Sequence, residues 1–284
     1  MIDTILYEKR DRMAFVTLNR PDAKNAIDPE MHEELCRIWR DFRDDADVDV
    51  AILSGTGDAF CAGADLRTYV PANYVEAYPS RVREIVNLGF GGLTRGLHRI
   101  PKPVIAAING WALAGGLELA LACDLRVASD RAMLGSFEAR RGFHHGDGGI
   151  VRLVNTCGVG VAMQLVLTAE PIDAQRALQC NLVTKVVSHD RLFDETELMA
   201  RQILRNSQRA VRSAKETILE VIGKPLDDAL RIEGWNSYSC VDRDEAAALL
   251  QRFYDKVDSG RVGAHPTVLP EVPRDRSPGG TEGT

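Results

Sequence analysis

The sequence predicts an α/β fold in which strands alternate with helices over the first half of the chain and helices dominate the second half. Buried strands are predicted where apolar residues run together, at residues 13–18 (MAFVTL), 50–53 (VAIL), 104–108 (VIAAI) and 125–128 (LRVA). After about residue 148 the pattern becomes helical, with helices predicted at residues 192–204, 210–222 and 246–257. Strands that alternate with helices are typical of a sheet covered by helices.

One further helix is predicted between the first two strands. Asp28 is a favourable N-cap, and Pro29 suits the first helical turn, where no N–H is needed. Apolar residues then recur at helical spacing, at Met31, Leu35, Ile38 and Phe42. This spacing predicts an amphipathic helix with one face on the core.

Length and composition indicate an ordinary globular protein. The chain has 284 residues, of which 45% are hydrophobic and 27% charged, enough for one large domain or one domain with a small appendage. A formal net charge of −6 argues against nucleic-acid binding, which needs a basic surface. A polyanionic small-molecule substrate remains compatible, because a local basic patch is enough to hold it.

The cysteines and the apolar segments argue against several other classes. None of the six cysteines forms a C-x-x-C pair, so we expect no zinc site and no other metal. Scattered cysteines and a start without an apolar leader lead us to expect a cytoplasmic protein with reduced thiols. The apolar run near residues 115–122 is interrupted by Glu118 and is too short to cross a bilayer, so we expect no membrane segment.

Two segments of small residues follow the second strand. The first, GTGDAF at residues 55–60, partly matches a dinucleotide fingerprint, but Phe60 replaces the third glycine and no helix pattern follows, so we expect no nicotinamide or flavin cofactor. The second, CAGADL at residues 61–66, lets the backbone approach a ligand closely. Taken alone, this composition is better explained by a tight turn.

Residues 107–120 (AINGWALAGGLELA) predict a strand end, a loop and a helix that begins near Gly115. A helix N-terminus carries unpaired N–H groups and positive partial charge, which suits a developing oxyanion. Glu118 lies in the first turn among apolar residues, where a carboxylate either is functional or pairs with the helix dipole. Glu138 follows another apolar stretch, and sequence spacing does not show whether the two carboxylates meet.

Four motifs, in the same order along the chain, resemble those of the enoyl-CoA hydratase/isomerase (crotonase) family. They are RP and NA at 20–21 and 25–26, AFCAGADL at 59–66, PVIAAINGWALAGGLELALACD at 103–124, and LT, IDA and the following residues through 187. The resemblance spans about residues 5–256. It implies a spiral of ββα turns followed by a helical region that trimerises.

This resemblance implies a domain organisation as well. We expect a crotonase-like spiral core that binds acyl-CoA at residues 1–200 and a C-terminal helical region at residues 201–262, which assembles the chain into a homotrimer or a hexamer of two trimers. The segment at 263–284 is rich in proline and glycine and is predicted to be a disordered tail.

The same resemblance implies an acyl-CoA substrate, with coenzyme A as part of that substrate and no separate cofactor. The N–H groups of Ala64 and Gly115 form the implied oxyanion hole, where enolate charge develops; one such donor is worth about 3–4 kcal/mol in comparable sites. The implied CoA and substrate contacts are Lys24, Ala26, Ala62, Ala64, Asp65, Leu66, Arg67 and Gly115.

Glu118 and Glu138 occupy the positions of the family's two catalytic glutamates. Hydratases use such a pair to deprotonate a water that adds to the β-carbon and to protonate the α-carbon, whereas many relatives with other activities have lost one acid. The sequence therefore favours an enoyl-CoA hydratase. The alternatives are an enoyl-CoA isomerase or a C–C bond hydrolase on the same scaffold, and a non-catalytic CoA-binding protein.

One loop departs from the family pattern. Where relatives have LGxxPGAGG, residues 141–149 read RGFHHGDGG, which introduces His144, His145 and Asp147. This loop lies over the acyl end of the pocket in relatives, so these side chains are candidates for an acyl pocket that favours polar, branched or cyclic groups. A loop whose polar side chains face water is the alternative.

Overall fold

The computed structural model describes residues 3–95 and 100–258. The predicted tail at 263–284 lies outside the described residues. The chain divides into two compact units, Met1–Cys240 and Val241–Thr284. The predicted boundary at residue 200 falls inside helix α6 (Leu192–Leu204), and it stays a prediction.

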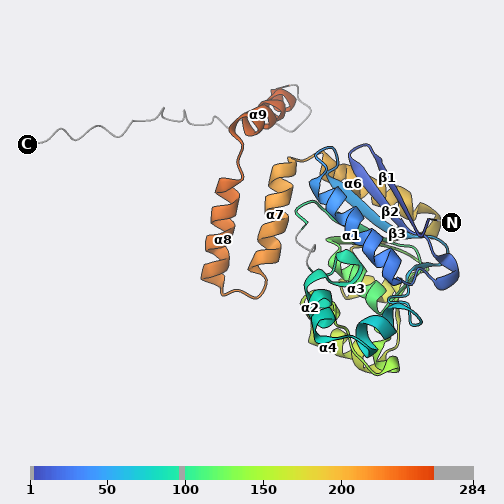
Figure 1. Ribbon diagram of the computed structural model, residues 1–284. Coiled ribbons are helices and arrows are strands. Elements are labelled where there is room, and N and C mark those ends of the chain that lie inside the picture. Colours follow the sequence, from blue (N-terminus) through green and yellow to red (C-terminus); the bar gives the residue numbers. More distant parts are fainter. Residues whose placement is uncertain (1–2, 96–99, 259–284) are drawn as a thin grey trace, which may run out of the picture. The chain divides into compact units, whose positions relative to one another are not determined.

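Six strands form the larger sheet (Figure 1). In spatial order they are β1 (Ile5–Arg10), β2 (Met13–Leu18), β3 (Val50–Gly55), β5 (Val104–Ile108), β7 (Leu125–Ser129) and β10 (Lys185–Val187). The β1–β2 pair is antiparallel and the other pairs are parallel. Strands β3 and β5 are buried at every position, which explains why they read as unbroken apolar runs.

A second sheet of four short strands is built from the segments that follow. Its order is β4 (Ala59–Cys61), β6 (Trp111–Leu113), β8 (Met133–Gly135) and β9 (Ile172–Asp173), parallel except for β8–β9. Strands β3, β5 and β7 of the first sheet are each followed by a strand of the second and then by a helix. This repeat confirms the predicted spiral of ββα turns.

The helices connect and cover these sheets. They are α1 (Pro29–Asp44), α2 (Pro79–Leu88), α3 (Gly115–Ala122), α4 (Gly149–Thr168), α5 (Ala174–Gln179), α6 (Leu192–Leu204), α7 (Gln208–Val221), α8 (Leu226–Ser239) and, in the second compact unit, α9 (Arg243–Asp258). Short helical segments are η1 (Pro21–Ala23), η2 (Pro71–Val75), η3 (Phe90–Gly92), η5 (Glu138–Arg141) and η6 (His189–Arg191).

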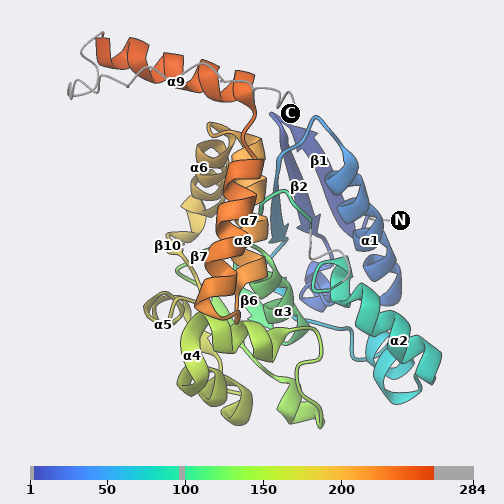
Figure 2. The same cartoon turned by 90° about the vertical axis from the view of Figure 1, so that its left-hand side faces the viewer.

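Alternate residues of the larger sheet enter two hydrophobic clusters. On β5, Val104, Ala106 and Ile108 face the cluster that includes α1, whereas Ile105 and Ala107 face the cluster that includes α6. The two helices therefore cover opposite faces of the sheet (Figure 2). The sheet is fixed on both sides, which gives the loops at its edge a rigid base.

The predicted helix after β2 is confirmed. Helix α1 begins at Pro29, and the Asp28 carboxylate accepts a 2.8 Å hydrogen bond from the N–H of Met31. The strands predicted at residues 13–18 and 104–108 and the helix predicted at 192–204 have the observed bounds. Helices α2, α4, α5 and α8 were not predicted.

Helix α4 is long and apolar enough to cross a membrane by length and composition, the one such helix among the described residues. Its backbone is not continuously helical, because Gly158 takes φ 76° and ψ 166° near the middle. Lipid-facing breaks of this kind leave backbone groups without partners. The first residue of α4, Gly149, donates its N–H to Glu118, so this helix is part of the fold around that carboxylate.

Candidate active site

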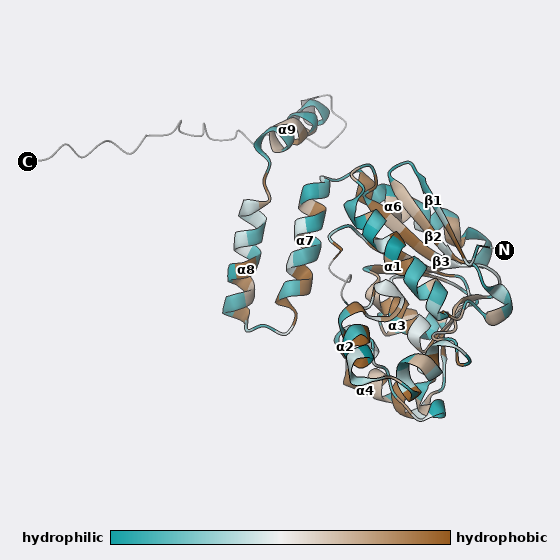
Figure 3. Ribbon diagram, viewed as in Figure 1, coloured by the Kyte–Doolittle hydropathy of each residue, from teal (hydrophilic) through white to brown (hydrophobic). Residues whose placement is uncertain are grey.

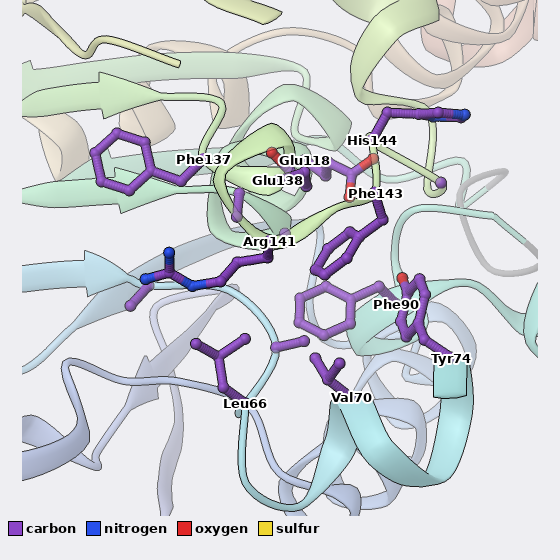
Figure 4. Close-up of a pocket in the computed structure, with 15 residues that line it drawn as sticks. Leu66, Val70, Tyr74, Phe90, Glu118, Phe137, Glu138, Arg141, Phe143 and His144 are labelled. Atoms are coloured by element: carbon purple, nitrogen blue, oxygen red, sulfur yellow. The ribbon is translucent and has the colours of Figure 1, made fainter. Parts of the chain in front are cut away.

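Both glutamates identified in the sequence line one cavity (Figure 4). The cavity has a volume of about 160 Å³, and four separate segments of the chain contribute to its walls. Ala62, Ala64 and Leu66 come from the segment after β4. Gly115 comes from the start of α3. The structure thus brings the CAGADL segment, the helix N-terminus and both carboxylates together.

The Ala64 amide is directed away from its neighbouring strand. The N–H of Ile27 donates to Gly63 O at 2.8 Å, and the N–H of Asp65 donates to Ile27 O at 2.9 Å, as in a parallel bridge between Ile27 and Ala64. In a parallel bridge, the residue between these two bonds turns its own N–H to the other side. Because Ala64 lines the cavity, its N–H is a candidate oxyanion donor.

The second amide, that of Gly115, begins α3 beside the same segment. A Cβ placed on Gly63 would lie 2.9 Å from Gly115 N, which shows how closely the two loops approach. Ala114, immediately before the helix, has φ 52° and ψ −124°, a conformation that is strained for a residue with a side chain. Its N–H donates to Gly135 O at 2.9 Å, so the strained turn is held in place by β8.

Aromatic rings form another part of the wall. A Cβ on Gly115 would lie 2.8 Å from the Phe90 ring, so the ring packs directly over the helix start. The rings of Tyr74 and Phe143 stack with centroids 5.5 Å apart. Figure 4 shows Phe90, Phe143 and Tyr74 gathered on one side of the cavity. Sequence reasoning missed these residues, because Tyr74 and Phe90 lie between the recognisable motifs and Phe143 lies in the divergent loop.

Glu118 is buried in the first turn of α3 and is fixed by the backbone of the divergent loop. Its Oε1 accepts hydrogen bonds from the N–H groups of Asp147, at 2.8 Å, and Gly149, at 2.9 Å. Charge-assisted bonds of this kind stabilise a carboxylate and fix its direction. The Glu118 carboxylate is therefore held by specific hydrogen bonds. The alternative in which it only pairs with the dipole of α3 does not account for these bonds.

Glu138 begins η5 and is also buried. Ser136 Oγ donates to its Oε2 at 3.2 Å, and Nδ1 of His145 lies 2.7 Å from its Oε1. The same Nδ1 lies 3.5 Å from Glu118 Oε1. Burial alone lowers the pKa of His145, but the hydrogen bonds and charges of Glu118 and Glu138 outweigh it and raise that pKa to about 9.

The side chains of the divergent loop have different surroundings. His144 is exposed at the cavity, and its Nδ1 lies 2.7 Å from the carbonyl oxygen of His145. Asp147 is buried, and its Oδ1 accepts from the N–H of Phe90 at 2.9 Å and from Thr94 Oγ1 at 3.2 Å. Burial and the charge of Glu118 raise the pKa of Asp147, against the effect of the Phe90 N–H. The loop is thus neither wholly pocket-facing nor wholly solvent-facing.

The hydrogen bonds of the Asp147 carboxylate are made to residues other than His145. The carboxylate of Asp147 faces Phe90 and Thr94, and also the Tyr74 hydroxyl at 3.4 Å. His145 instead contacts the two catalytic candidates. Nothing in the sequence pattern links residue 145 to residues 118 and 138, so this contact was missed.

Half of the predicted CoA and substrate contacts line the cavity, namely Ala62, Ala64, Leu66 and Gly115. Lys24 lies on the adjoining turn, where its carbonyl oxygen accepts from the N–H of Ala62 at 2.9 Å. The Lys24 side chain is exposed and pairs with Asp58. Lys24 is thus joined through its backbone to a residue of the cavity wall, and its ammonium is paired with Asp58.

The remaining predicted contacts stand beside the cavity. Ala26 offers its carbonyl oxygen to the guanidinium of Arg20, which also reaches Asp65 at 3.2 Å. The Asp65 carboxylate accepts from the N–H of Arg67 at 2.9 Å and caps the turn that follows. The Arg67 side chain is exposed. Asp65 thus shapes the segment that carries Ala64.

Three potential metal donors also meet here. Oxygen atoms of Glu118 and Glu138 and a nitrogen of His145 lie within 4.8 Å of one another. The His145–Glu138 distance of 2.7 Å is that of a close ion pair, and Glu118 Oε1 already accepts two N–H bonds. A proton on the imidazole accounts for this geometry without a metal ion.

Comparison with known proteins gives one consistent family. The model of the enoyl-CoA hydratase/isomerase family matches residues 8–260. The short-chain-enoyl-CoA hydratase of Clostridium acetobutylicum is 35% identical over 256 residues, which cover 90% of this chain and 96% of the relative. The (E)-benzylidenesuccinyl-CoA hydratase of Thauera aromatica is 37% identical over 223 residues, which cover 78% of this chain and 84% of the relative.

Solved structures agree with this. The crystal structure of an enoyl-CoA hydratase from Bacillus anthracis superposes with a TM-score of 0.79 at 35% identity, covering 89% of this chain and 97% of that chain. An enoyl-CoA hydratase/isomerase from Mycobacterium paratuberculosis gives a TM-score of 0.81 at 29% identity, covering 90% of this chain and 97% of that chain. The chain belongs to the enoyl-CoA hydratase/isomerase, or crotonase, family.

Proposed function

We propose that the protein is an enoyl-CoA hydratase, which adds water reversibly to a 2-enoyl-CoA to give a 3-hydroxyacyl-CoA. The observation that carries this proposal is the presence of Glu118 and Glu138 in one cavity with the amides of Ala64 and Gly115. A protein that only binds CoA has no need for two buried carboxylates in the wall of its site.

In the proposed reaction, the N–H groups of Ala64 and Gly115 bind the thioester carbonyl oxygen. Negative charge moves onto that oxygen as hydroxide adds to the β-carbon. Fixed donors stabilise it without reorganising, typically by about 3–4 kcal/mol each. The strain at Ala114 and the packing of Phe90 over Gly115 support this role, because both fix the direction of the second N–H.

The two carboxylates handle the water. They bind it on the β-carbon side and accept a proton as its oxygen attacks, and a proton is then returned to the α-carbon. Glu118 is directed by two backbone N–H groups and Glu138 by Ser136 and His145. This fixed placement supports their assignment as the catalytic pair, because proton transfer depends on geometry first.

The substrate is proposed to carry a short acyl group. The cavity of about 160 Å³ is small beside the roughly 300–1,000 Å³ of most ligand pockets, and its walls include Phe90, Phe143 and Tyr74. The relative named short-chain-enoyl-CoA hydratase is consistent with this size, and the relative named (E)-benzylidenesuccinyl-CoA hydratase, whose acyl group carries an aromatic ring, is consistent with aromatic walls.

The protein is also proposed to assemble as a homotrimer or a hexamer of two trimers. Helices α7 and α8 carry apolar segments (Figure 3), where Ile218, Leu226 and Leu230 are more than half exposed. Helix α4 exposes Val151 and Leu167 in the same way. Such area is typical of surfaces that a second copy covers. A cytoplasmic location stays a prediction, since one relative is named as mitochondrial.

The test is to incubate the purified protein with enoyl-CoA thioesters of differing length and shape and to follow absorbance and product mass. A hydratase gives a product heavier by one water. An isomerase gives a product of unchanged mass with a shifted double bond, and a C–C hydrolase gives two fragments. Binding by calorimetry with no product from any thioester would reject enzymatic function and favour the CoA-binding alternative.

A further inference from the structure

His145 is buried against the two catalytic candidates and does not itself line the cavity. Its side chain has no solvent exposure, and its Nδ1 lies 2.7 Å from Glu138 Oε1 and 3.5 Å from Glu118 Oε1. Neither ring nitrogen makes a hydrogen bond of acceptable angle among the described residues, so the contact of Nδ1 with Glu138 is a close ion pair. The imidazole therefore reaches substrate only through the two carboxylates.

The start of α4 is shaped around this ring. A Cβ on Gly149 would lie 2.5 Å from His145 Cγ, 2.6 Å from His145 Nδ1 and 3.0 Å from Glu118 Cγ. The N–H of the same glycine donates to Glu118 at 2.9 Å. A side chain at position 149 would displace either the imidazole or the carboxylate, so the position of His145 is built into the fold.

Charge balance explains why a histidine suits this place. Two carboxylates this close and this buried strongly disfavour the doubly ionised state unless a cation compensates. His145 is the basic side chain that touches both of them.

The other charged groups around the loop face Asp147. The Arg152 guanidinium from α4 donates to Asp147 O at 3.0 Å, and Arg95 lies 3.7 Å from the Asp147 carboxylate. The Tyr74 hydroxyl from η2 donates to that carboxylate at 3.4 Å. Arg152 bonds to backbone carbonyl oxygens, and its charge acts on Glu118 as well as on Asp147, whereas His145 contacts the carboxylates of Glu118 and Glu138 directly.

We propose that His145 is a positioning residue whose imidazolium holds Glu118 and Glu138 in place and compensates their charge. The inference rests on the proposed hydration. In this mechanism the proton added to the α-carbon comes from the attacking water. It does not come from a glutamic acid that was protonated before the water attacks.

The steps balance without another reactant. One O–H bond of water breaks, its proton passes to a carboxylate, and the oxygen bonds to the β-carbon. The alkene π pair becomes the enolate, which then takes that same proton at the α-carbon. His145 keeps its own proton throughout, and its raised pKa of about 9 is consistent with this.

The first test is the charge of His145 in the intact protein, measured by ¹⁵N NMR of labelled histidine. The signals are assigned with His145→Gln, and His189→Gln, outside the site on η6, is the matched control. We expect an imidazolium signature at His145 up to at least pH 8, and loss of its proton at lower pH in Glu138→Gln. A neutral His145 at pH 7 in the wild-type protein overturns the proposal, as does a bound metal whose removal by chelator changes the signal.

The second test is the pH profile of kcat/KM for hydration. His145→Gln removes the positive charge that contacts the two carboxylates. The acidic limb of the profile should move to higher pH by about one unit or more. Below the limb, kcat/KM should therefore fall about tenfold, while KM changes little. The His189→Gln profile should match the wild type. A His145→Gln profile that is merely scaled down, with no displaced limb, contradicts the proposal.

The two tests also separate this inference from the hydration it rests on. If no thioester is hydrated, the proposed function fails, and the NMR measurement alone still decides the charge of His145. If His145→Gln does not fold, the titration of the wild-type protein and of Glu138→Gln decides it.

Discussion

The N–H of Asp147 donates a 2.8 Å hydrogen bond to Oε1 of Glu118, so the backbone of the divergent loop is fastened to the helix that carries this carboxylate. The Asp147 side chain extends the connection by accepting from the N–H of Phe90 at 2.9 Å. One residue therefore joins a catalytic candidate to an aromatic wall of the cavity.

Asp147→Ala is expected to lower the free energy of unfolding by about 2–3 kcal/mol. The substitution leaves the buried N–H of Phe90 and the hydroxyl of Thr94 without this acceptor, and unpaired buried groups are costly. KM should rise because Phe90 loses its anchor. Urea unfolding measures the first effect and steady-state kinetics the second. Asp147→Asn, which keeps an acceptor oxygen, should lose clearly less stability; equal losses would show that the hydrogen bonds are not the cause.

Glu118→Gln and Glu138→Gln are each expected to lower kcat for hydration by about 10²–10⁴-fold with little change in KM, because an amide cannot accept the proton of water. The assay is the absorbance change of the best thioester from the panel. Glu170→Gln, an exposed glutamate that pairs with Arg140, is the control and should keep wild-type turnover. Near-normal turnover in either site variant would remove that residue from the catalytic pair.

Gly115→Ala is expected to reduce kcat by about ten- to a hundredfold, because the new Cβ would lie 2.8 Å from Phe90 and must tilt the helix start or displace the ring. Gly160→Ala in α4, where a Cβ meets no atom within 4 Å, is the matched control and should leave kcat unchanged. A Gly115→Ala/Phe90→Leu double variant should recover part of the lost turnover. No recovery, with the fold intact by circular dichroism, would point away from the packing explanation.

Much of the fold was predictable because local patterns determine it. The β5 strand reads VIAAI, and its residues are buried on both faces, so no other element fits the run. The Asp28 cap and the apolar spacing that ends at Phe42 likewise fixed α1. The spiral itself came from family resemblance, because strand order depends on contacts between distant segments.

The elements that were missed lack such patterns. Helix α4 contains Gly158 with a left-handed backbone and exposes Leu167, so neither its composition nor its period is that of an ordinary amphipathic helix. In the site, motif positions located Glu118, Glu138, Ala64 and Gly115, and the structure brings all four to one cavity. The contact of His145 with the glutamates depends on a loop turn that one sequence cannot reveal.

A homotrimer or a hexamer is expected in solution, with a mass of three or six times the 31.2 kDa chain by light scattering at micromolar concentration. Leu226→Glu in α8, at a side chain that is 72% exposed, should shift the mass towards the monomer, because a charge is costly in a buried contact. Glu233→Lys, an exposed charge reversal on the same helix, is the control. A wild-type monomer would contradict the proposed assembly.

The final prediction concerns the dependence of stability on pH. The pKa of His145, raised to about 9 in the folded protein, lies above the unperturbed 6.5, so its protonated form favours folding. This contribution is fully present below about pH 6.5 and is lost as pH rises through 9, a change of up to roughly 3 kcal/mol. The difference in unfolding free energy between wild type and His145→Gln should therefore shrink between pH 6.5 and 10, measured by urea titration at each pH. Ionisable groups that do not contact His145 are common to both proteins and cancel in this difference. A difference that stays constant over the window would mean that His145 holds no additional proton in the folded state.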